Sequence, residues 1–258
     1  AVAVGEAAVG EAAVPEAGSP ERVLQALYRA FGQHLDRMSA AASRPIRAIL
    51  MVDESQDIDA ALLESHGFER LSTLVFMLCT EPHFVDQPDP PRLDFRPLHG
   101  YADGCADGIV DGVVDDAEMK RMTELTERTY CNTLDFPRLA SISPAEEILN
   151  GYKEGGVFRP ELWFTLFDRS DADGAPLGVL LMTSIPEREE MELTYMGLVE
   201  SARGRGLARE IVAFAQAVAR EEGAAILLTS VDAQNLPAEK TYSTCGFRAY
   251  DHKTLYLR

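Results

Sequence analysis

Apolar residues along this chain follow two patterns, one typical of amphipathic helices and one typical of strands. Leu207, Ile211, Phe214 and Val218, for example, recur three or four residues apart and so share one face of a helix. Short runs rich in Leu, Val, Thr and Tyr, bounded by Gly, Pro and Asp, have the composition of strands. We predict helices over 20–38, 57–66, 115–130, 144–152, 207–218 and 237–245, and strands over 46–52, 71–79, 93–98, 162–168, 178–184, 191–199, 225–231 and 250–257. This order of elements predicts an α/β protein.

A glycine-rich loop, Arg203-Gly204-Arg205-Gly206, joins the strand over 191–199 to the helix that follows. The two glycines let the backbone approach a ligand closely and point successive N–H groups at it. The helix dipole and the side chains of both arginines are expected to add positive potential. The loop therefore suits a pyrophosphate, and a glycine turn before an ordinary core helix is the alternative.

The residues from Arg203 to Ala208 fit the [Q/R]-x-x-G-x-[G/A] pyrophosphate loop of the GCN5-related N-acetyltransferases (the GNAT family). A second signature follows in the expected order, because Asn235, Ala238 and Tyr242 have the N-x-x-A-x-x-x-Y spacing ahead of a Gly-Phe pair. The chain thus resembles this family. The resemblance implies a mixed α/β sheet of the acyl-coenzyme A N-acyltransferase type, with an antiparallel meander leading into the glycine loop.

The resemblance also implies that acetyl-coenzyme A is the cosubstrate. In proteins that this chain resembles, backbone amides at the positions of Leu198 and Val199 hold the pantetheine arm and help to polarise the thioester carbonyl. The glycine loop holds the pyrophosphate. We expect the cofactor to be held by Leu198, Val199, Arg203, Gly204, Arg205, Gly206, Leu207, Ala208 and Asn235.

Acetyl transfer to an amine needs a neutral amine, a polarised thioester carbonyl and a proton for the departing thiolate. Tyr242 matches the family position of the general acid, and a phenol with a pKa near 10 remains protonated at neutral pH. A core aromatic is the alternative for this residue. Glu192 lies six residues before Leu198, so strict alternation would place both on one sheet face, where the carboxylate can accept the amine proton. Glu190, or no dedicated base, is the alternative.

In this family the helices after the first strand commonly shape the acceptor pocket. Tyr130, Asp135 and Phe136 are therefore candidate substrate neighbours. The alternative is that they only end the helix and fill space in the core. The acceptor is expected to be a small-molecule amine or a peptide amine.

Two segments of the chain share one spacing. Val52 and Gly67 lie 179 residues before Val231 and Gly246, within the same predicted strand-helix-strand order. We therefore predict a degenerate, partial copy of the fold over 1–80, a proline-rich linker over 81–92 and a complete acetyltransferase domain over 93–258. The first copy lacks a glycine loop before its long helix, so no cofactor site is expected there. The alternative is that any strand-helix-strand unit can show such spacing.

The net charge of −18 would repel phosphate backbones and anionic membranes, so we expect neither nucleic acid nor membrane as a partner. No apolar run approaches the length of a membrane span, and the four cysteines show no metal-ligand spacing. We therefore expect a cytoplasmic monomer or homodimer without a metal. The acidic run over 103–118 is expected to be a solvated loop, because the spacing of a calcium loop is absent.

Other functions remain to be weighed. A dinucleotide-binding loop needs a third small residue where Arg209 stands, and no phosphate-binding G-x-x-x-x-G-K-[ST] motif is present. A non-catalytic acyl-coenzyme A sensor, or a scaffold with this fold, is the alternative to an enzyme.

Overall fold

The structure is a computed structural model that describes residues 20–42, 46–53, 60–98, 114, 116–154, 157–171 and 174–258. Its helices are α1 (Pro20–Ala42), α2 (Ala60–Ser65), α3 (Asp116–Tyr130), α4 (Pro137–Ile142), α5 (Ala145–Glu154), α6 (Leu207–Glu221) and α7 (Leu236–Thr244). Its strands are β1 (Ile49–Asp53), β2 (Glu69–Thr80), β3 (Leu93–Pro97), β4 (Trp163–Asp168), β5 (Gly178–Ile185), β6 (Glu190–Leu198), β7 (Ile226–Asp232) and β8 (Arg248–Leu257). All predicted elements are confirmed, with shifts of a few residues at their ends, and α4 was not predicted. Most of the acidic run over 103–118 lies outside the described residues.

The strands form one mixed sheet of eight, in the order β1-β8-β2-β7-β6-β5-β4-β3. The predicted α/β class with a mixed sheet is therefore confirmed. The chain divides into two compact units, one comprising Ala1–Thr73 with His252–Arg258 and the other Leu74–Asp251. These boundaries differ from the partition predicted at 1–80, 81–92 and 93–258, which remains a prediction.

In the first unit, β1 pairs antiparallel with the end of β8, so that Ile49 lies opposite Leu257. The core of this unit contains Leu63 and Phe68, and the ring of Phe31 from α1 stacks on Phe68 with centroids 6.2 Å apart. Amphipathic α1 therefore covers the apolar side of this small unit.

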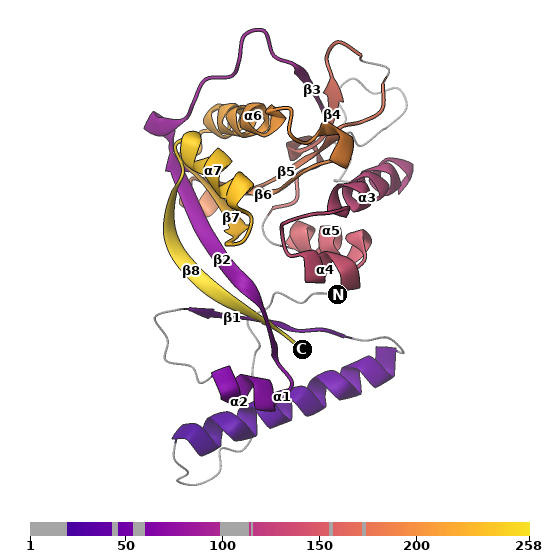
Figure 1. Ribbon diagram of the computed structural model, residues 1–258, viewed down its shortest axis with the longest axis vertical. Helices are drawn as coiled ribbons and strands as arrows, with labels where there is room; N and C mark the ends of the chain where they lie inside the picture. Colours follow the sequence, from indigo (N-terminus) through magenta and orange to yellow (C-terminus); the bar gives the residue numbers. More distant parts are fainter. Residues whose placement is uncertain are drawn as a thin grey trace. The chain divides into compact units, whose positions relative to one another are not determined.

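In the second unit, β3, β4, β5 and β6 form an antiparallel meander, and β7 then runs parallel to β6. Helices α3, α4 and α5 gather on one side of these strands, and α6 and α7 lie on the other (Figure 1). Phe214 of α6 stacks on Phe95 of β3 with ring centroids 3.7 Å apart, and Trp163 is fully buried. The meander and the parallel pair place the end of β6 directly before the glycine loop.

The same local structure occurs once in each unit. After α2, Phe68 N–H donates to the carbonyl of Leu63 at 3.1 Å, and after α7, Phe247 N–H donates to the carbonyl of Tyr242 at 3.1 Å. The intervening glycines, Gly67 and Gly246, both have a positive φ, of 81° and 88°. Left-handed backbone of this kind ends a helix and strongly favours glycine. The segments 52–67 and 231–246, which have equal length, therefore also end their helices with the same hydrogen bond.

The strand register repeats in the same way. Ile49 of β1 pairs with Leu257 of β8, and the residues 179 positions away from them, Leu228 of β7 and Leu78 of β2, also pair with each other. Any strand-helix-strand unit can have a similar length, but a common register is a more demanding match.

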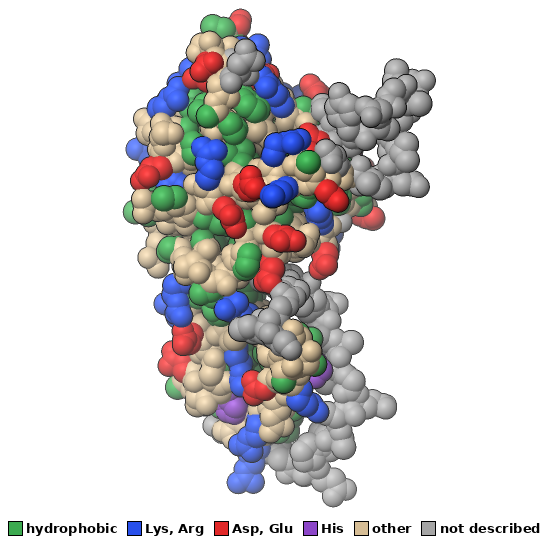
Figure 2. Space-filling view, turned by 90° about the vertical axis from the view of Figure 1, so that its right-hand side faces the viewer, with side chains coloured by type: hydrophobic (Ala, Val, Ile, Leu, Met, Phe, Trp, Pro, Cys, Tyr) green, Lys and Arg blue, Asp and Glu red, His purple; other side chains and the backbone are tan. Residues whose placement is uncertain are grey.

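Acidic and basic side chains are interspersed among the described residues on the face shown in Figure 2, as expected for a solvated surface. No helix in the described part of the chain is long and apolar enough to cross a membrane.

Candidate active site

The parallel strands β6 and β7 stay paired for only part of their length. Their register runs from the pair Glu190–Ile226 to the pair Leu193–Thr229 and ends there. At this last pair, the hydroxyl of Thr229 donates to the carbonyl of Leu193 at 3.0 Å. Beyond it the two strands are no longer paired, which leaves backbone groups of both strands facing the gap between them.

A cleft of about 680 Å³ lies at this separation. Its walls come from the unpaired ends of β6 and β7, the glycine loop, the start of α6, α7 and the segment after α3. Nine predicted site residues line it: Leu198, Arg203, Gly204, Gly206, Leu207, Ala208, Asn235, Tyr242 and Asp135. Val199, Arg205, Glu192, Tyr130 and Phe136 are not among its lining residues.

The glycine loop brings the N-terminal end of α6 to this cleft. Gly204 and Gly206 both have φ of 72°, and a Cβ at either position would meet open space. Gly206 occupies the N-cap position without a side-chain capping bond, so the first amides of α6 have no such acceptor. Amides at a helix N-terminus without intrahelical partners bind anions, and the dipole adds to the attraction. The predicted cradle therefore has the backbone geometry that a pyrophosphate needs.

The side chain of Arg203 is hydrogen-bonded to the backbone of the protein. Its guanidinium donates to three backbone carbonyls, those of Leu198 at 3.0 Å, Asn132 at 3.0 Å and Thr129 at 2.7 Å. These bonds tie the end of β6 to the end of α3. Three donors of this guanidinium are thus directed to the protein, while the residue still lines the cleft, so the predicted contribution of its charge remains a prediction.

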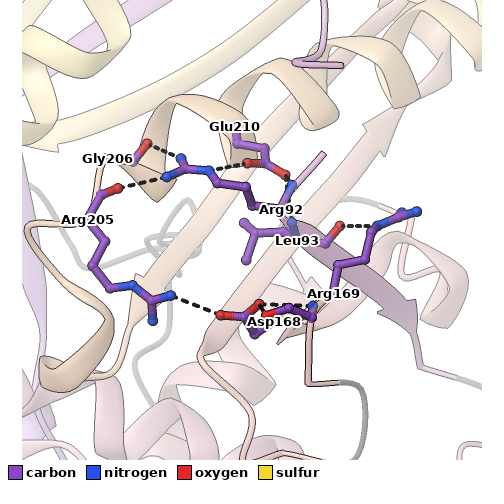
Figure 3. Close-up of polar contacts among 8 residues, drawn as sticks. Arg92, Leu93, Asp168, Arg169, Arg205, Gly206 and Glu210 are labelled. Carbon is purple, nitrogen blue, oxygen red and sulfur yellow. Dashed lines mark hydrogen bonds and ion pairs between the residues drawn. The ribbon is translucent and has the colours of Figure 1, made fainter. Parts of the chain in front are cut away.

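The side chain of Arg205 is also turned to the protein. Its guanidinium donates to Asp168 Oδ2 at 2.9 Å, as Figure 3 shows. Hydrogen bonds from Ser170 and then from Arg205 lower the pKa of Asp168 to about 2. The backbone of the loop is therefore the part that would contact a pyrophosphate, and the cradle itself remains a prediction.

This difference predicts unequal effects of two substitutions. Arg203→Met removes three charge-assisted bonds and should lower the free energy of unfolding by about 2–4 kcal/mol. Arg205→Met removes one exposed ion pair and should lower it far less. Urea denaturation of both variants measures the two losses, and equal losses would contradict the assignment.

The two predicted strand amides differ from each other. Val199 N–H donates to the carbonyl of Leu177 at 2.9 Å, so the prediction that it holds the pantetheine arm is corrected. N–H groups point alternately to the two sides of a strand, which directs the amide of Leu198 away from β5 and toward the separation from β7. Only Leu198 thus keeps the predicted backbone role.

Tyr242 lines the cleft and is only 4% exposed. Its hydroxyl is hydrogen-bonded to Thr229, the residue of the last β6–β7 pair. Burial raises the pKa of Tyr242 well above its ordinary value, so the phenol remains protonated throughout the neutral range. Asn235 caps α7 beside it, because its side-chain oxygen accepts from Ala238 N–H at 3.3 Å.

Asp135 is a partly buried carboxylate in the wall of the cleft. It accepts a hydrogen bond from Asp232 N–H at 3.0 Å and one from the side chain of Asn235. Desolvation raises its pKa, and the hydrogen bonds only partly oppose this effect. Phe136 N–H in turn donates to Asp232 Oδ2 at 3.3 Å, which fixes the segment after α3 to the end of β7.

The predicted relation between Glu192 and Leu198 is wrong. In the pairing of β6 with β5, Tyr195 lies opposite Leu181 but Leu193 lies opposite Met182, so Thr194 is an extra residue. Such a bulge reverses the alternation and places Glu192 and Leu198 on opposite faces. Desolvation raises the pKa of Glu192. Its role as a base remains a prediction.

Tyr130 belongs to a cluster of aromatic residues beside the cleft. Its ring meets Tyr195 edge-on at 5.7 Å, and its buried hydroxyl has no hydrogen-bond partner among the described residues. The hydroxyl of Tyr195, which lines the cleft, pairs with that of Thr129 at 2.8 Å. Sequence reasoning missed these two residues, since only the bulge brings Tyr195 to the face of α3.

Among the described residues, no group of three or more His, Cys, Asp or Glu side chains is arranged to hold a metal ion.

Comparison with known proteins identifies the class to which this fold and cleft belong. The model of the acetyltransferase (GNAT) family matches residues 130–247. This chain therefore contains a GNAT acetyltransferase domain over these residues, and the resemblance noted in the sequence is confirmed. No curated protein matches the chain.

Solved structures share the fold at low identity. A GCN5-related N-acetyltransferase from Sphaerobacter thermophilus has 19% identity and a TM-score of 0.58, over 91% of this chain and 67% of that one. One from Kribbella flavida has 17% identity and a TM-score of 0.54, over 90% and 75%. A tandem GNAT protein from the clavulanic acid biosynthesis pathway has 12% identity and a TM-score of 0.52, over 93% and 71%. At these identities the likeness shows the fold alone.

Proposed function

We propose that this chain is an N-acetyltransferase that moves an acetyl group from acetyl-coenzyme A to a primary amine by direct attack. The observation that carries the proposal is a cleft that joins the first amides of α6, which have no side-chain cap, to the buried phenol of Tyr242. The family match supports acyl transfer in general, and these two features support the finer reaction.

The residues present fit the cosubstrate. The amides of Gly206 and its neighbours would hold the pyrophosphate, and open space beside both loop glycines leaves room for it. The amide of Leu198 would bond the pantetheine arm where β6 leaves β7. Acetyl-coenzyme A itself supplies the activated acetyl thioester.

The chain's own groups would then manage the protons. Tyr242 would donate its phenolic proton to the departing thiolate, since a protonated phenol is available at neutral pH. Asp135 would attract the ammonium form of the acceptor into the cleft, because it is an acid in a largely apolar wall. Asp135 or Glu192 would accept the proton that the amine must lose before it attacks.

Two assays separate an enzyme from the alternatives. Coenzyme A should raise the melting temperature of the chain, because a ligand that binds only the folded state stabilises it. Acetyl-coenzyme A with a panel of primary amines should release free thiol only when an accepted amine is present. A melting shift without amine-dependent thiol release would indicate a sensor, and the absence of both would indicate a scaffold and refute the proposal.

We also propose that residues 1–80 are a degenerate, partial copy of the same fold. The matching helix-ending bonds after α2 and α7 support this, as does the common register of the β1–β8 and β2–β7 pairs. Where the second copy has Tyr242, the first has Leu63, which has no proton to donate. Only the second copy would therefore be catalytic.

A further inference from the structure

Arg92, the last residue of the predicted linker, contacts the glycine loop directly. Its guanidinium donates to the carbonyl of Arg205 at 3.0 Å and to that of Gly206 at 3.1 Å (Figure 3). Two consecutive loop carbonyls are thus held by one planar, charged group. Arginine is suited to this because its donors lie in a rigid fork.

Glu210, in the first turn of α6, fixes Arg92 in this position. Its carboxylate is only 2% exposed and accepts from the backbone N–H groups of Arg92 and Leu93, both at 2.7 Å. The other oxygen lies 3.3 Å from Arg92 Nε. On the far side, Arg169 N–H donates to the carbonyl of Arg92 at 2.8 Å. The arginine is therefore held through both its backbone and its side chain.

The two clamped carbonyls determine where the next two amides point. In a trans peptide the C=O and N–H groups are coplanar and directed to opposite sides. The carbonyl of Arg205 shares its peptide plane with the amide of Gly206, and the carbonyl of Gly206 shares its plane with the amide of Leu207. When Arg92 holds both carbonyls on its own side, both amides are directed away from it. Gly206 and Leu207 are both among the residues that line the cleft.

We infer that Arg92, held by Glu210, is a positioning residue that orients the amides of Gly206 and Leu207 toward the pyrophosphate. The inference rests on the proposed function. The positive charge of Arg92 also polarises the two peptide groups, which makes their N–H groups stronger hydrogen-bond donors. This role makes the cradle depend on a residue more than 110 positions earlier in the chain.

Three ligands test the inference, because they differ in whether a pyrophosphate is present. Coenzyme A and dephospho-coenzyme A both carry this group, and pantetheine does not. In Arg92→Met the dissociation constants of the first two should rise roughly tenfold, as expected for the loss of oriented, polarised donors. The constant for pantetheine should stay at the wild-type value. Protein NMR titration measures all three, including weak binding.

Two further variants complete the experiment. Arg96→Met, on the strand β3 that begins directly after Arg92, removes an exposed pair with Asp94 and should leave all three constants unchanged. Arg92→Lys keeps the charge but not the fork, so it should weaken only the two pyrophosphate ligands, by a smaller factor. If Arg92→Met does not fold, Arg92→Lys provides the test. Dissociation constants for coenzyme A and dephospho-coenzyme A that equal those of the wild type in Arg92→Lys would overturn the inference.

The outcomes distinguish this inference from the proposed function. A wild-type chain that binds none of the three ligands refutes the proposed function and the inference with it. Wild-type binding with unchanged constants in the Arg92 variants refutes the inference alone. An equal loss for pantetheine also refutes it, because a merely structural role would weaken every ligand alike. Hydrogen exchange of the Gly206 and Leu207 amides should become faster in Arg92→Met.

Discussion

Replacing Tyr242 with phenylalanine should lower kcat by about 10²- to 10³-fold while leaving the affinity for coenzyme A within about twofold of the wild type. The substitution removes only the hydroxyl that would protonate the departing thiolate. Thr229 keeps its own bond to the carbonyl of Leu193, so the last β6–β7 pair stays intact. Steady-state kinetics measures the first quantity and calorimetric titration with coenzyme A the second.

The raised pKa of Tyr242 adds a pH dependence to this prediction. A phenol whose pKa lies above the ordinary value of 10.0 stays protonated at every pH below it. The wild-type enzyme should therefore show no loss of kcat from this group between about pH 7 and 9. An alkaline loss of kcat within that range that is absent in Tyr242→Phe would contradict a buried, high-pKa acid.

A matched control separates loss of the acid from loss of packing. Tyr256 is another buried tyrosine, 6% exposed, and belongs to the core of the first unit. Tyr256→Phe makes the same chemical change without touching the cleft, so its kcat should equal that of the wild type. If the two variants have equal turnover, Tyr242 is not the acid.

Much of this architecture could be predicted from the sequence because the determining signals are local. The spacing of apolar residues is enough to locate α6. The two glycines of the preceding loop indicate an unusual backbone by themselves, and both have a positive φ in the structure. The short helix α4 was missed because its six residues are too few to show a helical spacing of apolar positions. Local pattern thus locates elements and the cleft, but not every connection.

The errors concern interactions between distant residues. The bulge at Thr194 depends on how β6 pairs with β5, and one extra residue reverses the face of Glu192 relative to Leu198. Arg203 donates to carbonyls more than 70 residues away, which no spacing near the loop reveals. Glu210 lies three residues after Leu207 in the first turn of α6, and an acidic residue at this helical spacing was an available signal that another part of the chain contacts the loop.

Replacing Asp135 with asparagine should lower kcat/KM for amine acceptors by about 10²-fold, largely through KM, and leave binding of coenzyme A unchanged. The substitution removes the negative charge that would attract the ammonium form, but it retains a side-chain oxygen for Asp232 N–H. The loss should be absent when a neutral hydroxylamine replaces the amine, because no cation is then recognised. Kinetics with a matched pair of acceptors measures both effects.

Glu192→Gln is the informative comparison, since it makes the same charge change on a partly buried residue that does not line the cleft. A loss in this variant and not in Asp135→Asn would transfer the role to Glu192. Losses in both that shrink as the pH approaches the pKa of the amine would indicate that the two carboxylates share removal of its proton.

Stability provides an independent test of Asp135, and its sign follows from the raised pKa. A carboxyl group whose pKa is higher in the folded than in the unfolded state binds protons more readily when folded. Its stabilising contribution is complete below the unfolded pKa and is lost as the pH rises through the folded pKa. The free energy of unfolding of the wild type, relative to Asp135→Asn, should therefore fall from acidic to neutral pH. A residue retained at neutral pH despite this cost is typical of a functional site, whereas a relative free energy that rises with pH would identify Asp135 as an ordinary structural carboxylate.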